Sequence, residues 1–566
     1  MIAKIYVHRK VQGGLAFDYK FTGASLPVYS LVEVPFSAGK VIGLVDSVIS
    51  KSNFASKSIL RVLSKSSVFT SDQVNLAKIM SDYYLSSFAE IVFAFLPNLN
   101  LRDLKSLGAN YKVQKNKKGE IHQIIASKSE RVEYFSQVLF RDKSQNGQTV
   151  IVLPTIKQID ETALLLKKYL PMQKIVIWHS QLNREEKAII WQQILLGENL
   201  IVVGTRHSLF LPYTYLKNIF IDDPLNFAYQ DDQAPYYNAY TVARMLTKIS
   251  RANFFIGGET PDIFSFIGIL RKSIILTELK SNLKIKILPA FNNKIIENQR
   301  VLRDQIKNQK KILVVGSWKD VFRLVCNDCK NAVSCTNCKG EMFTKQNRIC
   351  AQCATVNSSL SCKICRGTNI RRLGFDRFEF QKNMEGMFPQ FKNNFSYLTW
   401  GELEKSDQSF DIALIPYFSL MLNSPYLRNR QKLFRQIRGL KSSGVGNVYI
   451  YGENLYDNKF VKQLQDNDWE GFLSGELKER KKLNLPPFTR SFLVWSKDRD
   501  IKRGADNLNR WCEKISNAEE ITFLPVPGDT GILALVERRK FKNFAKTVLA
   551  ISQGNIYLGA DPLEFS

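Results

Sequence analysis

The chain has 566 residues, 45% of them hydrophobic, and a formal net charge of +28. This length exceeds what one hydrophobic core supports, so we expect several domains. No uninterrupted apolar segment is long enough to span a membrane, which excludes an integral membrane protein with helical spans. The positive charge predicts a polyanionic partner, most simply nucleic acid, with solvated lysine-rich surfaces as the alternative explanation.

The first part of the chain changes from a strand pattern to a helix pattern. Apolar and polar residues alternate over residues 1–50, in AKIYV, FDYKF, LVEVPF and KVIGLVDSVI. This alternation predicts a small, strongly bent β-barrel or sheet. From about residue 57 to 104, apolar residues recur at intervals of three and four, which indicates helices. The polar, basic segment 112–120 then predicts a linker.

Alternating strands and helices dominate the rest of the chain. Short β-branched or aromatic runs (TVIVL, KIVIWHS, NLIVVGT, NIFIDD and NFFIGG) are separated by polar segments of helix length. A second set contains KILVVGS and DIALIP. This pattern is typical of parallel α/β sheets. We therefore predict a multidomain α/β protein with one lobe at 121–280, a second at 281–475, and a C-terminal α+β domain at 476–566.

Eight of the nine cysteines form four Cys-x-x-Cys pairs, which begin at Cys326, Cys335, Cys350 and Cys362. Each pair directs two thiolates at one point, and two pairs complete a tetrahedral zinc site. The pairs therefore predict an insertion at 324–368 with two structural zinc ions, although spacing alone does not say which pairs share an ion. Disulfides or unmetallated thiols are the alternative. Because the chain shows no secretory signal, this cysteine usage favours the reducing cytoplasm.

Short motifs follow this order of domains along essentially the whole chain. They are Phe17-Asp18-Tyr19, Val34-Pro35-Phe36, Asp82-Tyr83-Tyr84, His179-Ser180, residues 201–206 (IVVGTR), Tyr229 with Pro235 and Tyr237, the four cysteine pairs, Gly374 with Arg377 and Glu379, Phe388-Pro389, Glu479-Arg480, residues 485–488 (LPPF) and Asp561-Pro562. In this order and at these intervals, the chain resembles the PriA family of primosomal replication-restart helicases.

The resemblance implies a role for each domain. Residues 1–56 would bind the 3′ end of a nascent strand at a DNA fork, through Phe17, Asp18, Tyr19 and Lys57, with Phe17 stacking on the terminal base and Asp18 accepting from its 3′-hydroxyl. Residues 57–111 would form a winged helix, and 121–280 and 281–475 two RecA-like helicase lobes. The family arranges its zinc ligands as nested sets, here Cys326, Cys329, Cys362 and Cys365 for one ion and Cys335, Cys338, Cys350 and Cys353 for the other. Its partners would be forked DNA, single-stranded-DNA-binding protein, and primosome or helicase-loading proteins.

The chain departs from the family at the first nucleotide motif. An ATP-driven motor needs a glycine-rich loop around the phosphates, a Lys on them, and a Ser or Thr hydroxyl on magnesium. After the expected strand at 122–125 this chain has ASKSERVEYF. Glu130 stands at about the Lys position and Arg131 at the Ser/Thr position. A carboxylate at the Lys position would repel the phosphates.

Three further motifs are also changed. Asp-Glu-Glu-His reads Asp222-Asp223-Pro224-Leu225, so that Asp222 could still hold magnesium and Asp223 could orient a water. Gly-Ser-Ala-Thr-Pro reads GGETP at 257–261, and Leu440 stands where lobe two should supply an arginine. Effects within such a coupled unit are not additive, and losing the phosphate Lys alone removes most of the rate. We therefore predict an inactive motor without ATP and magnesium as working cofactors.

The sequence thus predicts a cytoplasmic replication-restart protein that binds stalled or abandoned forks, contains zinc and does not unwind DNA by itself. Two alternatives stay open. One is an active ATP-dependent 3′–5′ DNA helicase with unconventional nucleotide contacts, which binding at millimolar ATP would favour. The other is a zinc-ribbon scaffold that acts on RNA, which the relative affinities for forked DNA and structured RNA would distinguish.

Overall fold

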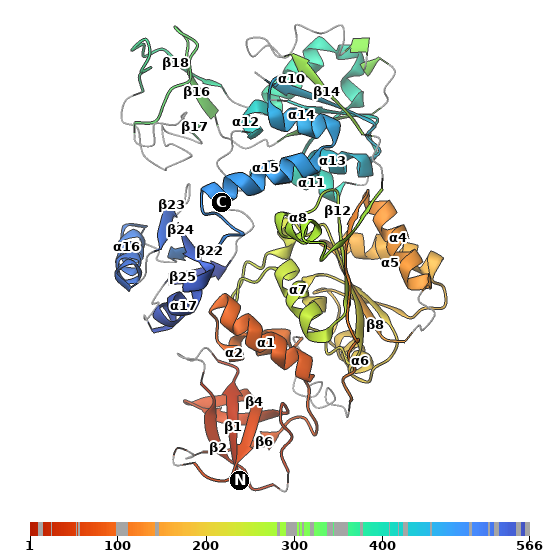
Figure 1. Cartoon of the computed structure of the whole chain (residues 1–566), viewed down its shortest axis with the longest axis vertical. Coiled ribbons are helices and arrows are strands. Elements are labelled where there is room, and N and C mark those ends of the chain that lie inside the picture. The colour runs from red at the N-terminus through yellow and green to blue at the C-terminus, as the bar shows by residue number, and fades with distance from the viewer. Residues whose placement is uncertain are drawn as a thin grey trace. The chain divides into compact units, whose positions relative to one another are not determined.

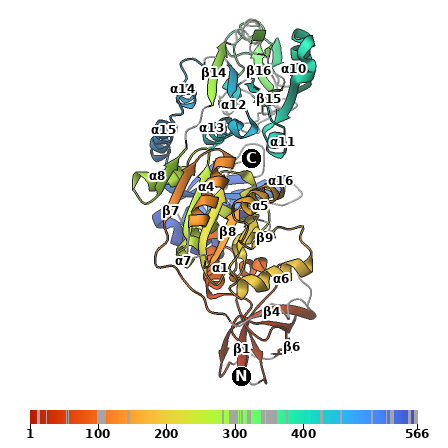
Figure 2. The ribbon, with the colours of Figure 1, turned by 90° about the vertical axis from the view of Figure 1, so that its right-hand side faces the viewer.

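The computed structural model describes residues 1–9, 15–23, 25–52, 54, 57–97, 111–141, 146–279, 283–289, 303–304, 306–307, 311–316, 322–336, 343–344, 360–373, 377–406, 408–416, 418–422, 428–452, 455–496, 501–518, 521–525, 531–550 and 556–560. It divides into two compact units (Figures 1 and 2). Unit 1 contains Met1–Leu279, Arg539–Gln553 and Leu558–Pro562, and unit 2 contains Lys280–Arg538, Gly554–Tyr557 and Leu563–Ser566.

Unit 1 begins with a sheet of strand order β5-β2-β1-β4-β3-β6. Its strands are β1 (Ile2–Val7), β2 (Phe17–Lys20), β3 (Leu31–Phe36), β4 (Gly39–Ile49), β5 (Lys57–Ser58) and β6 (Arg61–Val62). Alternate residues of β1 (Ala3, Ile5 and Val7) are buried in one core, which confirms the period-two pattern. Because β5 pairs with β2 and β6 with β3, residues 57–62 belong to this sheet, and the predicted boundary at 56 falls inside it.

Two helices follow, α1 (Ser71–Tyr84) and α2 (Phe88–Phe95). Thr70 and Gln73 form a capping box at the start of α1. The Gln73 amide also donates to Phe210 O (2.7 Å), and the backbone N–H of Asn238 donates to the Tyr84 hydroxyl (3.1 Å). In both views, α1 lies between the N-terminal sheet and the first α/β lobe (Figures 1 and 2). The winged-helix assignment stays a prediction.

The segment 112–120, predicted as a linker, contacts both of its neighbours. Lys115 pairs with Asp72 of α1 (3.1 Å), and Asn116 donates to Leu216 O of lobe one (3.0 Å). The backbone N–H of Gln114 donates to Thr214 O (2.7 Å). Three residues of this segment thus bond to its neighbours, while Lys112, Lys117 and Lys118 are exposed.

Lobe one is a sheet of order β13-β7-β12-β11-β8-β10-β9, and all its pairs are parallel. The strands are β7 (Ile121–Ile125), β8 (Gln148–Val152), β9 (Ile175–Trp178), β10 (Ile201–Gly204), β11 (Leu216–Asp222), β12 (Asn253–Gly258) and β13 (Ile275–Glu278). The helices are α4 (Lys128–Arg141), α5 (Ile156–Tyr169), α6 (Arg184–Leu195), α7 (Ala239–Ser250) and α8 (Ile263–Leu270), with 3-10 turns η2 (Arg206–Phe210) and η3 (Phe227–Tyr229). Figure 1 shows α4 and α5 on one side of the sheet and α7 on the other.

Lobe two, in unit 2, is a parallel sheet of order β14-β21-β20-β15-β19. The strands are β14 (Lys284–Pro289), β15 (Ile312–Gly316), β19 (Phe395–Thr399), β20 (Ile412–Ile415) and β21 (Asn447–Gly452). The helices are α10 (Arg377–Met387), α11 (Trp400–Lys405), α12 (Phe418–Leu422), α13 (Asn429–Gly439), α14 (Lys459–Asp466) and α15 (Trp469–Lys482), with η4 (Pro389–Asn394) and η5 (Leu440–Ser443). The runs KILVVGS and DIALIP become β15 and β20, whose residues are buried throughout, as parallel central strands should be.

The cysteine segment forms its own small sheet of β16 (Phe322–Cys326), β17 (Phe343–Thr344) and β18 (Ile370–Leu373). It leaves lobe two directly after β15, as predicted. Near the C-terminus lie β22 (Thr489–Ser496), β23 (Thr522–Pro525), β24 (Gly531–Glu537), β25 (Ile556–Ala560), α16 (Ile501–Ala518), α17 (Phe541–Ala550) and η6 (Arg538–Lys540). Strands β22 and β23 pair antiparallel with β24, which agrees with an α+β domain. In the part of the chain that the structure describes, no helix combines the length and apolar character needed to cross a membrane.

Candidate functional site

The place of the first nucleotide motif is a very short turn. Strand β7 ends at Ile125 and α4 begins at Lys128, so that only Ala126 and Ser127 connect them. The Glu130 carboxylate accepts from the backbone N–H of Ser127 (2.9 Å) and from the Ser127 hydroxyl. In nucleotide-binding proteins, a phosphate occupies such a helix N-terminus. Here the Glu130 carboxylate accepts the hydrogen bond from the backbone N–H of Ser127 in place of a phosphate.

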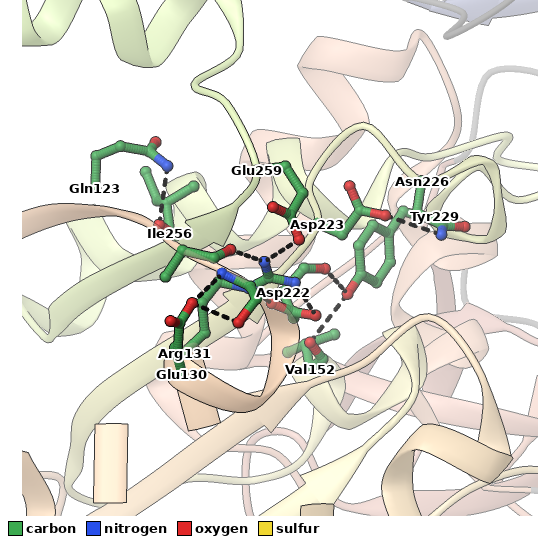
Figure 3. Close-up of polar contacts among 12 residues, drawn as sticks. Gln123, Glu130, Arg131, Val152, Asp222, Asp223, Asn226, Tyr229, Ile256 and Glu259 are labelled. Carbon is green, nitrogen blue, oxygen red and sulfur yellow. Dashed lines mark hydrogen bonds and ion pairs between the residues drawn. The ribbon is translucent and has the colours of Figure 1, made fainter. Parts of the chain in front are cut away.

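Arg131 lies at the centre of a buried ion cluster at the carboxyl ends of β7, β11 and β12 (Figure 3). Its guanidinium donates two hydrogen bonds to the Asp222 carboxylate, from Nε to Oδ1 at 2.5 Å and from Nη2 to Oδ2 at 3.1 Å. The Nη1 group donates to Glu259 Oε1 at 3.1 Å and to Ala126 O. The side chains of Arg131 and Asp222 are each only 4% exposed. Two parallel bonds to one carboxylate are the strongest arrangement available to an arginine.

The charges of this cluster shift one another's protonation. Burial alone would lower the pKa of Arg131, but the neighbouring Asp222 and Glu259 carboxylates raise it above its ordinary value. Burial raises the pKa of Glu259 to about 7, against the lowering effect of Arg131. Arg131 therefore stays charged, whereas Glu259 changes its protonation near neutral pH.

The surrounding backbone is fitted to the ion pair. A Cβ atom at Gly257 would lie 2.9 Å from both Asp222 Oδ1 and Arg131 Cδ, so that only glycine leaves room for them. The buried Tyr229 hydroxyl contacts Asp222 O (2.6 Å) and Val152 O (3.0 Å), which fixes the end of β11 (Figure 3). Asp223 follows with a φ of 56°, and its carboxylate accepts from the Asn226 side chain (3.1 Å).

This arrangement does not fit a magnesium nucleotide. Both Asp222 oxygens, which would coordinate the metal, are bonded to Arg131, and Glu130 occupies the helix N-terminus that would receive a phosphate. In unit 2, Leu440 is 1% exposed and lies in the core, in η5. A buried aliphatic side chain cannot stabilise charge on a transferred phosphoryl group.

The N-terminal sheet places its predicted DNA-binding residues in different surroundings. The ring of Phe17 packs against the core and meets Phe36 edge to face at 5.3 Å. Tyr19 is buried, and its hydroxyl donates to Pro35 O (3.0 Å). The predicted stacking of Phe17 on a base stays a prediction, and its ring already has a partner within the protein.

Asp18 lies on the opposite face of β2 from Phe17 and Tyr19, since side chains alternate along a strand. Its carboxylate accepts from the Ser52 hydroxyl through Oδ2, and Lys4 Nζ lies 3.9 Å from Oδ1. Lys57 is exposed on the neighbouring β5, opposite Tyr19. Lys4, the register partner of Asp18, shares its face of the sheet, whereas Lys57 is on the same face as Tyr19. The Lys4 side chain is 44% exposed and that of Asp18 10%.

The cysteine segment brings together one of the two predicted zinc sets. The sulfurs of Cys326, Cys329, Cys362 and Cys365 all lie within 4.8 Å of one another. Two pairs, Cys326 with Cys365 and Cys329 with Cys362, are 3.4 Å apart. A tetrahedral ion with Zn–S bonds of about 2.3 Å would hold its sulfurs ~3.8 Å apart, so these residues fit a structural zinc ion. The four cysteines of this predicted set thus form a cluster that could hold a metal ion.

The second predicted set is only partly described. Cys335 is buried, whereas Cys338, Cys350 and Cys353 lie outside the described residues. The second zinc site stays a prediction.

Several known proteins are similar to this chain in sequence. The family model of the PriA 3′ DNA-binding domain matches residues 5–97. The replication restart protein PriA of Borreliella burgdorferi is 22% identical over 574 residues, which span 89% of this chain and 86% of that protein. That of Helicobacter pylori J99 is 24% identical over 84% of this chain and 83% of that protein. The domain match and these low identities over most of the chain support a divergent member of the PriA family.

Solved helicases are more distant. The structure of RecG bound to a three-way DNA junction covers 73% of this chain and 50% of its own, at 10% identity and a TM-score of 0.35. The PriA family model spans both the N-terminal sheet and the helices α1 and α2.

One residue of the ion cluster, Glu259, was not predicted from the sequence as a functional residue. Glu259 is recognisable only as a changed position within GGETP, and its role as the second acceptor for Arg131 needs the fold. A signal was present, since a cation and two anions occupy three motif positions that would surround one nucleotide. Ser52 and Lys4, which contact Asp18, belong to no quoted motif.

Proposed function

We propose that this protein recognises forked DNA during replication restart and does so without ATP turnover. The match of residues 5–97 to the PriA 3′ DNA-binding domain carries the DNA-binding part of the proposal. The bidentate pair between Arg131 and Asp222 supports the absence of ATP turnover, because a nucleotide would have to break a buried ion pair to reach the metal-binding carboxylate. Lobe one would then act as a scaffold rather than a motor.

Fork binding measured with and without magnesium ATP tests both parts. We expect the full chain to bind a fork whose leading strand ends in a 3′-hydroxyl at the junction more tightly than a fork lacking that end. The affinity should not change when ATP is added, and DNA should not stimulate phosphate release above the buffer background. Restoring one residue by Glu130→Lys should not start turnover, since Arg131 and Leu440 stay in place. Turnover that Asp222→Asn abolishes would instead favour an active helicase, and preference for structured RNA a scaffold acting on RNA.

We also propose two zinc ions per chain. The clustered set at Cys326, Cys329, Cys362 and Cys365 supports one ion, and the remaining cysteine pairs support the other. Structural zinc contributes on the order of 10 kcal/mol to the folding of its local domain. Chelation, or Cys362→Ser, should therefore unfold the segment around 322–373 and leave the N-terminal sheet folded. Metal analysis of the reduced protein that found no zinc would contradict this.

The protein partners and the compartment remain proposals of the same kind. Single-stranded-DNA-binding protein and primosome or helicase-loading proteins are the expected partners, since a fork-binding protein without its own motor needs another protein to supply unwinding. The cytoplasm is the expected compartment because clustered cysteine thiolates bind zinc only while they are reduced.

A further inference from the structure

The segment 226–240, which runs from the end of β11 into α7, contains five aromatic residues, but most of their rings are closed to a ligand. The structure describes this whole segment, and Phe227 alone among the five is open to solvent, at 61%. The other four rings, each at most 9% exposed, are those of Tyr229, Tyr236, Tyr237 and Tyr240. A base stacks only on a ring whose face is accessible. The four tyrosines therefore serve contacts within the protein.

Hydrogen bonds hold the segment to lobe one and close it on itself. The Tyr229 hydroxyl fixes its start to β8 and β11. Arg206 of η2 donates from Nη1 to Ala228 O (3.0 Å), and its Nε lies 3.4 Å from Asp231 Oδ2. The backbone N–H of Asp231 donates to Tyr237 O (2.9 Å). The segment thus has a fixed conformation on the lobe-one sheet.

Phe210 of η2 lies where this segment meets the helices α1 and α2. Its ring stacks on Phe95 of α2, with the centroids 4.4 Å apart and the planes inclined by 11°, and it meets Tyr237 edge to face at 5.0 Å. Its carbonyl oxygen accepts from the side-chain amide of Gln73 on α1 (2.7 Å). Phe210 and Phe95 are only 2% and 4% exposed. One buried residue therefore contacts the segment and both helices.

A second contact lies at the other end of the segment. The backbone N–H of Asn238 donates to the hydroxyl of Tyr84, the last residue of α1 (3.1 Å). The side-chain oxygen of Asn238 accepts from the backbone N–H of Thr241 (3.1 Å) and so caps α7. Asn238 and Tyr84 are 4% and 2% exposed. The residue that begins α7 therefore also holds the end of α1.

Helix α2 extends these contacts to the N-terminal sheet. Its Phe93 stacks on His8, with the centroids 4.7 Å apart, and its Phe88 meets Tyr6 of β1 at 4.7 Å. Since Phe95 of the same helix stacks against lobe one, α2 has aromatic partners on both sides. Ring contacts therefore connect β1 to lobe one through a single helix.

We propose that the segment 226–240 fastens α1 and α2 to lobe one, so that the N-terminal sheet and lobe one keep a fixed relation without a bound nucleotide. We call Phe95, Phe210, Tyr237 and Tyr84 the aromatic joint. Its members pack at the density of a protein core, so that the joint does not deform gradually. The proposal concerns the free protein, and it stands whether or not lobe one hydrolyses ATP or binds forks.

Hydrogen exchange of the full chain without DNA, followed on peptides from α1, α2 and α5, tests this proposal. Phe210→Ala should raise the exchange rates in α1 and α2 about 100-fold or more, because truncating a buried Phe weakens packing by at least that factor. Helix α5, on the side of the lobe-one sheet away from α7, should keep its protection (Figure 1). Phe227→Ala is the matched control, since it removes an exposed Phe ring from the same region, and it should change neither.

A milder variant separates the joint from general damage to lobe one. Tyr84→Phe keeps the ring and removes the hydroxyl, so the core stays filled while the Asn238 N–H loses its acceptor. Exchange in α1 should then rise about 10-fold. The fastening role is overturned if Tyr84→Phe leaves α1 unchanged, if Phe210→Ala speeds exchange in α5 as much as in α1, or if Phe227→Ala has the effect of Phe210→Ala. None of these results depends on fork binding, which tests the proposed function separately.

Discussion

The carboxyl ends of the lobe-one strands and the outer face of the N-terminal sheet each carry a pair of opposite charges that includes a family motif position, but the two pairs have different contacts. In lobe one, Arg131 and Asp222 bond to each other, and the side chain of each is 4% exposed. On the N-terminal sheet, Lys4 and Asp18 are 3.9 Å apart, and their side chains are 44% and 10% exposed. The first pair is bidentate and buried, whereas the second is longer and has one exposed partner.

This difference shows why residue type alone does not define a binding site. A buried ion pair that loses one partner leaves an uncompensated charge, so a ligand must replace that interaction in full before it gains anything. A partly exposed carboxylate or lysine exchanges only water for its ligand. The lobe-one pair is therefore costly to break, whereas the longer Lys4–Asp18 pair should cost little to separate. Both conclusions can be tested by substitution.

The largest effect should follow the loss of the arginine. Arg131→Ala leaves Asp222 buried without its counter-ion, and we expect the free energy of unfolding to fall by about 3–5 kcal/mol. Denaturant unfolding of the full chain, followed through probes in unit 1, measures this change. Lys4→Ala should change the same quantity by less than about 1 kcal/mol, since exposed ion pairs contribute little.

A second substitution distinguishes the lost pair from general damage to lobe one. Asp222→Asn removes the charge that Arg131→Ala leaves unpaired, so the double variant should be more stable than the sum of the single effects predicts. Strict additivity would mean that the two side chains are not energetically coupled. The comparison between the two regions would then lose its basis.

A smaller effect on binding is expected at the N-terminal face. Asp18→Asn keeps the shape of the side chain and removes its charge. A hydrogen bond to a charged group contributes about 1.5–3 kcal/mol, so the Kd for a fork with a 3′-hydroxyl at the junction should rise about 10-fold or more. Forks without that end should bind as before, and the unfolding free energy should hardly change. Equal losses on both forks would assign Asp18 a structural role.

The sequence predicts most of the fold because hydrophobic periodicity is a local property. The alternation in β1 and the continuous apolar runs of β8, β10, β15 and β20 identify these strands directly. The polar segment 112–120 is misleading, since its side chains and backbone bond to neighbours far away in the chain. Composition shows that a segment is polar, but not which distant carbonyl it reaches.

The candidate sites also differ in how much of each can be predicted from the sequence. Cysteine spacing identifies candidate metal ligands because each pair is local, whereas the nested set of Cys326, Cys329, Cys362 and Cys365 is what the family resemblance implies. The altered nucleotide motifs are visible individually, but the bond between Arg131 and Asp222 joins residues 91 positions apart. Only the parallel order of β7, β12 and β11 brings them together. The sequence alone therefore indicates that the nucleotide-binding residues are changed. The structure adds that two of the changed positions, Arg131 and Asp222, form an ion pair with each other.

The last effect concerns the pH dependence of the ion cluster around Arg131. Burial raises the pKa of Glu259 to about 7 from an ordinary value near 4.5; Asp222 and Asp223 also raise it, whereas Arg131 lowers it. A carboxyl group whose pKa is raised by folding binds more protons in the folded state, so its stabilising contribution is complete below about pH 4.5 and is lost as the pH rises through about 7. The free energy of unfolding should thus fall by about 3 kcal/mol as the pH rises through this range, relative to a chain without the titration. Glu259→Gln provides that reference, since its amide oxygen can still accept from Arg131 and the other titrating groups cancel in the difference. A difference that grows in favour of the wild-type chain with rising pH would mean that Arg131 outweighs burial and holds Glu259 ionised.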